Sequence, residues 1–295
     1  MTVTGLQRIL WPFCLVGLWF SLAAHALLAY AVGHWRARSG IPGWRSWFRA
    51  WLREVRWAYP VFAWWQPFRT QAIPDLIRGD WADGHGPTGV VLIHGFLCNR
   101  AFWTPWLRRF RAQGRPFVAL TLDGPFDGID THVQAVNDAV DRMSRLTGRP
   151  PLIVAHSMGG LVARAWCAWA RQNGGQGWRL ADRVCGVITM GSPHQGTWLA
   201  RFSRTDNGRQ MVAGGPWLDS LAALETREDL ACFESWSTDC DAVVFPAGST
   251  TLPGAATCRL VEEGHVSMVF APVVWASVLS HLERADKALP AVVFF

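Results

Sequence analysis

The chain has 295 residues, of which 50% are hydrophobic, 13% aromatic and only 17% charged. This composition excludes an intrinsically disordered chain, and seven cysteines are too sparse for a small disulfide-stapled scaffold. The formal net charge of +6 comes from the first 70 residues, which hold eight arginines and one acid; the nearly neutral remainder carries no nucleic-acid-binding motif, so we expect no nucleic-acid partner.

The N-terminus contains a long uncharged segment. Residues 9–33 include no Asp, Glu, Lys or Arg, and as a helix these 25 residues extend about 37 Å. A bilayer core is about 30 Å thick, so the segment predicts a transmembrane anchor over residues 1–34. Two alternatives remain open. Residues 29–31 (AYA) form an acceptable signal-peptide cleavage site, and the segment could instead be a buried helix of a soluble protein.

Residues 35–70 are basic and rich in tryptophan. The apolar side chains recur every three to four residues, as on one helical face: Trp44, Phe48, Trp51, Leu52, Val55 and Tyr59. The arginines recur on a neighbouring face: Arg45, Arg49, Arg53 and Arg56. This pattern is typical of an amphipathic helix at the lipid headgroups, and its alternative is a helix packed on the domain that follows. The positive-inside rule then predicts a single-pass protein of the bacterial inner membrane with its C-terminal domain in the cytoplasm.

From residue 71 to residue 295 the sequence predicts one α/β domain. Apolar strand-like segments span residues 89–93, 117–122, 152–155, 184–190, 231–233 and 257–261. Helical segments span residues 101–113, 131–146 and 158–171. Such alternation predicts a mostly parallel sheet covered by helices.

The most informative motif lies at residues 155–160 (AHSMGG), where an apolar strand meets a helix. A nucleophilic serine in this position sits in a sharp turn that tolerates only small neighbours, here Ala155 and Gly159. The turn places the Ser157 hydroxyl at a helix N-terminus, where free backbone N–H groups and positive potential are available.

Three segments resemble the α/β-hydrolase fold, and specifically its bacterial triacylglycerol lipase/esterase branch: residues 94–96 (HGF), 155–164 (AHSMGGLVAR) and 191–197 (GSPHQGT). The resemblance covers roughly residues 85–285, and Ala155 replaces the glycine that is usual in the motif. It implies a mostly parallel central sheet with helices on both faces, without cofactor or metal.

In this family the triad follows the order serine, acid, histidine. Asp241 is favoured as the acid because it precedes a valine and a proline in a loop, as the family's acid does. Its rivals are Asp239, Glu262 and Glu263. His265 follows a late strand, where the family has its base, so the predicted triad is Ser157, Asp241 and His265.

Two backbone N–H groups are expected to bind the oxyanion. One belongs to Met158, the residue after the nucleophile, and the resemblance assigns the other to Phe96.

The segment from about residue 198 to 230 contains few strand signals and several turns. Lipases of this kind place a cap or lid there, and the alternative is an ordinary insertion. As a cap it would line an acyl pocket with Trp198, Phe202, Met211 and Trp217.

Cys240 and Cys258 flank the acid loop. A disulfide between them would imply an oxidising compartment, which disagrees with the predicted cytoplasmic orientation.

Together these features predict a membrane-anchored serine esterase or lipase that cleaves carboxylic esters of acyl lipids. The expected partners are the acyl-ester substrate and membrane lipids. The alternatives are an acyltransferase or thioesterase of the same fold, and a catalytically silent membrane-bound scaffold.

Overall fold

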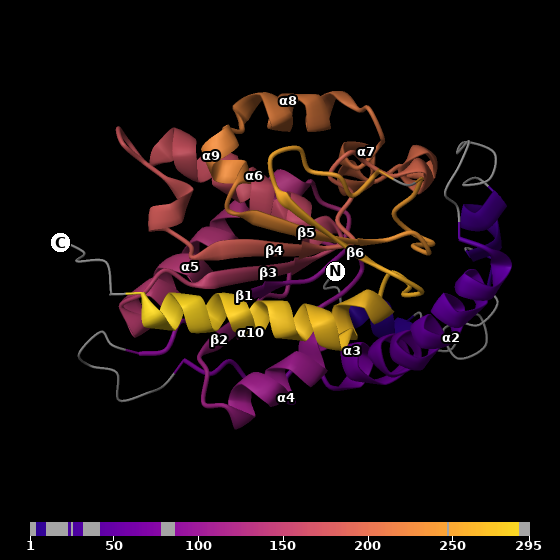
Figure 1. Ribbon diagram of the computed structural model, residues 1–295, viewed down its shortest axis with the longest axis horizontal. Coiled ribbons are helices and arrows are strands. Elements are labelled where there is room, and N and C mark those ends of the chain that lie inside the picture. Colours follow the sequence, from indigo (N-terminus) through magenta and orange to yellow (C-terminus); the bar gives the residue numbers. More distant parts are fainter. Residues whose placement is uncertain are drawn as a thin grey trace.

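A computed structural model describes residues 4–9, 23–24, 26–31, 42–77, 86–246 and 248–288 (Figure 1). Its centre is a six-stranded sheet in the order β2-β1-β3-β4-β5-β6, and every pair of neighbouring strands is parallel. The strands are β1 (Val90–Ile93), β2 (Phe117–Ala119), β3 (Leu152–His156), β4 (Gly186–Met190), β5 (Phe233–Thr238) and β6 (Ala256–Leu260). The predicted parallel sheet is therefore confirmed.

Side chains of the central strands alternate between two buried faces. Val91, Ile93 and Ile153 join one apolar cluster, whereas Val90 and Leu92 join another on the opposite face. Because both faces exclude water, the strands are continuously apolar rather than amphipathic, as a parallel sheet requires.

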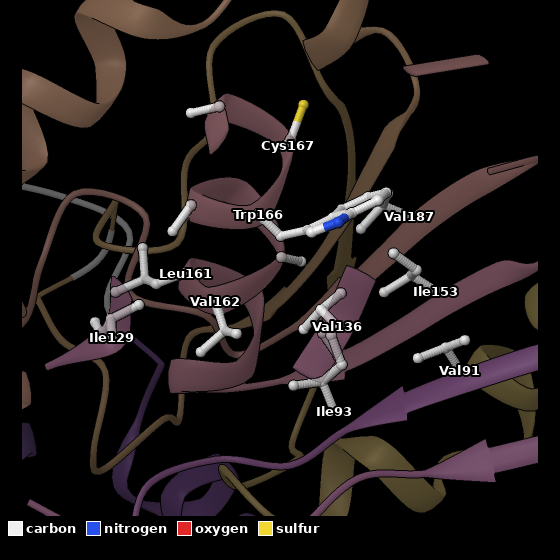
Figure 2. Close-up of a cluster of buried hydrophobic side chains, with 14 of the residues drawn as sticks. Val91, Ile93, Ile129, Val136, Ile153, Leu161, Val162, Trp166, Cys167 and Val187 are labelled. Carbon is white, nitrogen blue, oxygen red and sulfur yellow. The ribbon is translucent and has the colours of Figure 1, made fainter. Parts of the chain in front are cut away.

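Helices cover both faces of the sheet (Figure 1). The helices α5 (Val133–Thr147) and α6 (Met158–Asn173) lie on one face. On the other lie α4 (Thr104–Ala112) and α10 (Pro272–Lys287). Figure 2 shows the first cluster, in which the Trp166 indole of α6 reaches the sheet near Val187.

The basic N-terminal segment forms α2 (Trp44–Pro60), which continues through a π-helical turn (Val61–Trp65) into α3 (Gln66–Phe68). One face of α2 is buried against the α/β domain, and Trp57 stacks on Phe270 with ring centroids 4.3 Å apart. The neighbouring face leaves Trp44, Phe48 and Leu52 exposed at 66%, 52% and 48%. The structure thus packs this helix on the domain while keeping a second apolar face outward.

The predicted transmembrane segment falls mostly outside the described residues. Residues 4–9 are helical, and so is the described stretch 26–31, where Tyr30 makes an edge-on ring contact with Trp47 of α2. No helix within the described ranges is both long enough and apolar enough to cross a bilayer.

The predicted cap between β4 and β5 consists of short helical elements: a 3₁₀ turn (Trp198–Phe202), α7 (Asp206–Gln210), α8 (Pro216–Leu224) and α9 (Arg227–Leu230). Leu218 and Leu221 of α8 join the same buried cluster as α6.

Cys240 and Cys258 are free thiols, so the structure contains no disulfide between the acid loop and β6.

Candidate active site

Ser157 occupies a strained turn between β3 and α6. Its φ of 54° lies in the left-handed region, which L side chains rarely adopt. The neighbouring backbone is so close that a Cβ on Gly159 would lie 2.6 Å from the carbonyl oxygens of Ile93 and His94. Ala155 is fully buried within β3, so the single methyl group there is accommodated.

Three side chains predicted from sequence meet in one hydrogen-bonded array. The Ser157 hydroxyl lies 3.0 Å from Nε2 of His265, and Nδ1 of His265 lies 2.8 Å from Oδ2 of Asp241. All three residues are buried, at 7%, 6% and 2% exposure. Since Asp241 can only accept when ionised, Nδ1–H of His265 donates to it, which leaves Nε2 free to accept from the serine.

The charge state of His265 reflects two opposing effects. Burial lowers its pKa, but the charge and hydrogen bond of Asp241, with the charge of Glu54, outweigh burial and raise the pKa above its ordinary value. Asp241 is itself held by the backbone N–H groups of Val243 and Val244, each donating to Oδ1 over 2.8 Å. The carboxylate is therefore fixed toward the histidine.

The rival acids lie in other interactions. Asp239 forms an ion pair with Arg259 at the surface. Glu262 and Glu263 pair with two arginines of α2, Arg49 and Arg53, over 2.9 and 3.0 Å. Those arginines therefore bind the domain rather than serving only as free surface cations.

The other histidines near the motif are buried and uncharged. Nε2 of His94 accepts from the backbone N–H of Leu122, while Nδ1 donates to the carbonyl of Gly95. Burial lowers the pKa of His94 to about 4 and holds that of His156 well below its usual range. Nε2–H of His156 donates to the His265 carbonyl over 3.0 Å, so both residues support loops around Ser157.

The two residues expected to bind an oxyanion lie on either side of Ser157. Met158 is the first residue of α6, where backbone N–H groups lack helical partners. Phe96 lines the cavity beside Ser157. The next residue, Leu97, has its carbonyl fixed by a 2.8 Å hydrogen bond from the Gln7 amide, so the described N-terminal helix contacts this loop.

A mainly apolar cavity of about 220 Å³ opens above Ser157 and His265, and we call it the inner cavity. One wall comes from α2 and residue 26, and the other from the loops around Phe96 and Asp241. Its lining includes Ala26, Trp47, Ala50, Trp51, Glu54, Phe62, Phe96, Cys98, Cys240, Ala242, Val243 and Val266.

The four residues predicted to form the acyl pocket do not line the inner cavity, and that expectation needs correction. Trp198 packs on Phe202 and Phe245, while Phe202 is 66% exposed. Met211 is buried in the domain core, and the Trp217 indole donates to Asp130. The cap packs against α6, so the wall facing Ser157 comes from α2 instead.

The sequence analysis missed Glu54 as a site residue. It lies in α2 yet is only 7% exposed, and it lines the inner cavity. A signal was present: Glu54 is the single acid among the first 70 residues, and Ala50 and Ala58 share its helical face. Small neighbours on that face permit close packing, which buries the carboxyl group.

No group of three or more His, Cys, Asp or Glu side chains in the described part of the chain is arranged to hold a metal ion.

Comparison with known proteins supports the same fold. The mature form of the Bacillus licheniformis lipase BlEst2 is 15% identical, with a TM-score of 0.56 over 67% of this chain and 92% of that chain. Aspergillus fumigatus lipase B is also 15% identical, with a TM-score of 0.58 over 73% of this chain and 56% of that one. The Legionella pneumophila phospholipase PlaB is similar at 15% identity, a TM-score of 0.50 and coverages of 69% and 60%.

No curated protein sequence matches this chain. A family model described as the alpha/beta hydrolase family matches residues 90–293, which include Ser157, Asp241 and His265. Those residues, the parallel sheet and the strained serine turn all fall within the matched region. The chain belongs to the alpha/beta hydrolase family.

Proposed function

We propose that this protein is a serine esterase or lipase that hydrolyses carboxylic esters of acyl lipids. The observation that carries the proposal is the buried array of Ser157, His265 and Asp241 at an apolar cavity. An apolar wall favours an acyl chain, while the array supplies the nucleophile and base that ester cleavage needs. The similar lipase structures are in keeping with this substrate class.

The proposed reaction follows from the hydrogen-bond directions. Nε2 of His265 takes the hydroxyl proton as Oγ of Ser157 bonds to the ester carbonyl carbon. The resulting oxyanion accepts from the backbone N–H groups of Phe96 and Met158. His265 then protonates the departing alcohol, leaving an acyl-serine. A water molecule, deprotonated by His265, cleaves that ester and releases the fatty acid.

We extend the proposal to the membrane. Contact with lipid would come from the uncharged run over residues 9–33 and from the exposed Trp44, Phe48 and Leu52 of α2, which would enter the headgroup layer. The arginine-rich sequence after the run favours a cytoplasmic catalytic domain. Such a placement would bring the inner cavity close to lipid substrates.

A fluorophosphonate probe tests the function. Purified protein should be labelled at Ser157, and Ser157→Ala should abolish both labelling and hydrolysis of p-nitrophenyl butyrate. Absence of labelling in folded wild-type protein contradicts the proposal. If the serine is labelled but no p-nitrophenyl ester is hydrolysed to free acid, the transferase alternative gains support.

A further inference from the structure

A second apolar hollow lies beside the inner cavity, on the outer side of α2. This outer groove has a volume of about 410 Å³, nearly twice that of the inner cavity. Its lining is almost wholly apolar and comes from two helical segments: Ala23, Ala26, Leu27, Tyr30, Trp44, Trp47, Phe48 and Trp51. None of the described residues that line it is charged.

The outer groove and the inner cavity share part of their walls. Ala26, Trp47 and Trp51 line both hollows. The two hollows therefore adjoin each other at these side chains, and the exposed Trp44 and Phe48 line the outer one. A ligand whose ester carbonyl lies at Ser157 and whose chain outgrows the inner cavity meets the apolar side chains shared with the outer groove.

We propose that the outer groove binds the distal part of a long acyl chain whose ester is cleaved at Ser157. This inference rests on the proposed function and narrows the substrate class to long-chain acyl esters. Each methylene transferred from water to such a groove raises affinity about fourfold. The groove, rather than the serine array, then sets the preference for chain length.

Filling the outer groove tests the proposal. Ala23 lines the groove but not the inner cavity, so Ala23→Trp should spare p-nitrophenyl butyrate, whose chain is short. Hydrolysis of p-nitrophenyl laurate should lose about tenfold or more in kcat/KM. Ala24→Trp adds the same side chain at an exposed neighbour that does not line the groove and is the matched control.

The outcomes separate the groove from the underlying function. Wild-type protein that hydrolyses neither ester contradicts the proposed function itself. If wild-type protein cleaves both esters and Ala23→Trp leaves the laurate-to-butyrate ratio unchanged, the groove proposal is overturned while the function stands. Equal losses in Ala23→Trp and Ala24→Trp overturn it too, because they would reflect a general disturbance of the helix.

A separate observation concerns Glu54, whose carboxylate is enclosed by the loop that carries His265. The backbone N–H of Val266 donates to both carboxylate oxygens over 2.9 Å, and that of Ser267 donates to Oε2 over 2.8 Å. These are the two residues directly after His265. A Cβ on Gly264, the residue before it, would lie 2.4 Å from Oε2 of Glu54.

These contacts fasten α2 to the histidine loop. Val266 and Ser267 begin the 3₁₀ turn Ser267–Phe270, whose first N–H groups have no partner within the turn. Glu54 supplies the missing acceptors from a distant part of the sequence, as a capping side chain does. The Arg49–Glu262 and Arg53–Glu263 pairs hold the same loop just before His265.

We infer that Glu54 is a positioning residue: its carboxylate fixes the backbone directly after His265 by hydrogen bonds and lies close to Gly264 directly before it. The helix α2 then belongs to the active site, although it lies outside the region matched by the family model. The inference is independent of the outer groove, because it depends on hydrogen bonds rather than on an apolar surface.

Several charged groups face this carboxyl group. Burial raises the pKa of Glu54 to about 7, against the lowering effects of the two backbone hydrogen bonds and of His265, while Asp241 raises it further. Glu263, paired with Arg53, accepts from the Ser267 hydroxyl on the far side of the turn. The charge of each group therefore acts on the pKa of the other, and Glu54 and His265 titrate as interacting neighbours.

The pH profile of Glu54→Gln tests the positioning role. Hydrolysis requires neutral His265, so kcat/KM rises with pH through the raised pKa of this histidine. The Glu54 charge is one cause of that raised pKa, so its loss shifts the rising limb to lower pH. The altered loop should also lower kcat about tenfold or more, with little change in KM.

Two variants complete the experiment. Glu283→Gln removes an exposed acid of α10 and should leave both the kcat and the pH at which kcat/KM rises unchanged. Glu54→Asp keeps the charge but shortens the reach, so it should lower kcat without the shift seen in Glu54→Gln. If a folded Glu54→Gln protein shows the rise of kcat/KM at the same pH as the wild type, the inference is overturned. A Glu54→Asp protein with full activity overturns it too.

Discussion

At the residue scale, the two oxygens of Asp241 have different partners. Oδ1 accepts from the backbone N–H groups of Val243 and Val244, whereas Oδ2 faces Nδ1 of His265. The residue thus fixes its own loop with one oxygen and the histidine tautomer with the other. An amide at this position can satisfy only the first of these demands.

Asp241→Asn is therefore expected to abolish most activity while preserving the fold. The amide oxygen keeps the backbone hydrogen bonds, but its NH₂ group faces Nδ1 and moves the imidazole proton to Nε2, toward Ser157. The expected loss in kcat is about 10⁴-fold. The rate of p-nitrophenyl butyrate hydrolysis checks the expected loss of activity, and the thermal unfolding midpoint checks that the fold is preserved.

Asp239→Asn provides the matched comparison, because Asp239 pairs with Arg259 at the surface and does not contact His265. It should retain nearly full activity. A severe loss of activity in Asp239→Asn together with an active Asp241→Asn protein would show that Asp239, and not Asp241, is the acid that acts on His265.

At this scale the sequence motif was sufficient to find Ser157 and its strained turn, because the small residues around it have a local steric cause. Glu54 and the true cavity lining were not predictable in the same way. Their roles depend on which distant segments pack against them, and 211 positions separate Glu54 from His265 in the sequence.

At the element scale, α6 is fixed by a buried ion pair at its outer side. The Arg164 guanidinium donates to both oxygens of Glu225, over 2.6 and 2.8 Å, and to the carbonyl of His194. The two side chains are only 2% and 5% exposed. The pair links α6 to the residue after α8, and hence the predicted cap to the helix that directly follows Ser157.

Glu225→Ala should destabilise the protein by about 3–5 kcal/mol, because it leaves a buried guanidinium without its counter-charge. The thermal unfolding midpoint is expected to fall by about 10 °C. Asp182→Ala removes a partner of Arg179 from an exposed pair and should leave the midpoint unchanged, since water screens that interaction. Equal effects of the two substitutions would contradict a structural role for the buried pair.

The helix α2 shows where an element can be predicted but its environment cannot. Its periodic apolar face and its arginines indicated an amphipathic helix, and the structure contains one over Trp44–Pro60. Periodicity does not distinguish a lipid surface from a protein surface. The packing of Trp57 on Phe270 and the Arg49 and Arg53 ion pairs show that a protein surface covers one face.

At the scale of the whole molecule, α2 lies along one side of the hydrolase domain (Figure 1), and one of its apolar faces is exposed. Trp44, Phe48 and Leu52 project from this face, next to the outer groove. A membrane surface would bury these side chains, as the proposed function expects.

Replacing these three side chains together with serine should weaken binding to vesicles that contain anionic lipid. Because aromatic and leucine side chains supply the apolar area, the partition coefficient is expected to fall about tenfold or more in vesicle co-sedimentation. Hydrolysis of the water-soluble butyrate ester should change little. Unaltered vesicle binding would show that α2 does not contact lipid.

The sequence by itself determined the sheet and the serine turn, because these depend on local steric rules and short-range apolar periodicity, whereas the order of the candidate triad was implied by the resemblance to the α/β-hydrolase fold. Only the tertiary structure decided what surrounds Ser157. The uneven charge and the tryptophans of the N-terminal segment suggested a membrane surface, but part of that segment forms a wall of the inner cavity. The physical reason is that an amphipathic face specifies burial without specifying its partner; here long-range packing placed α2, with Glu54, against the histidine loop.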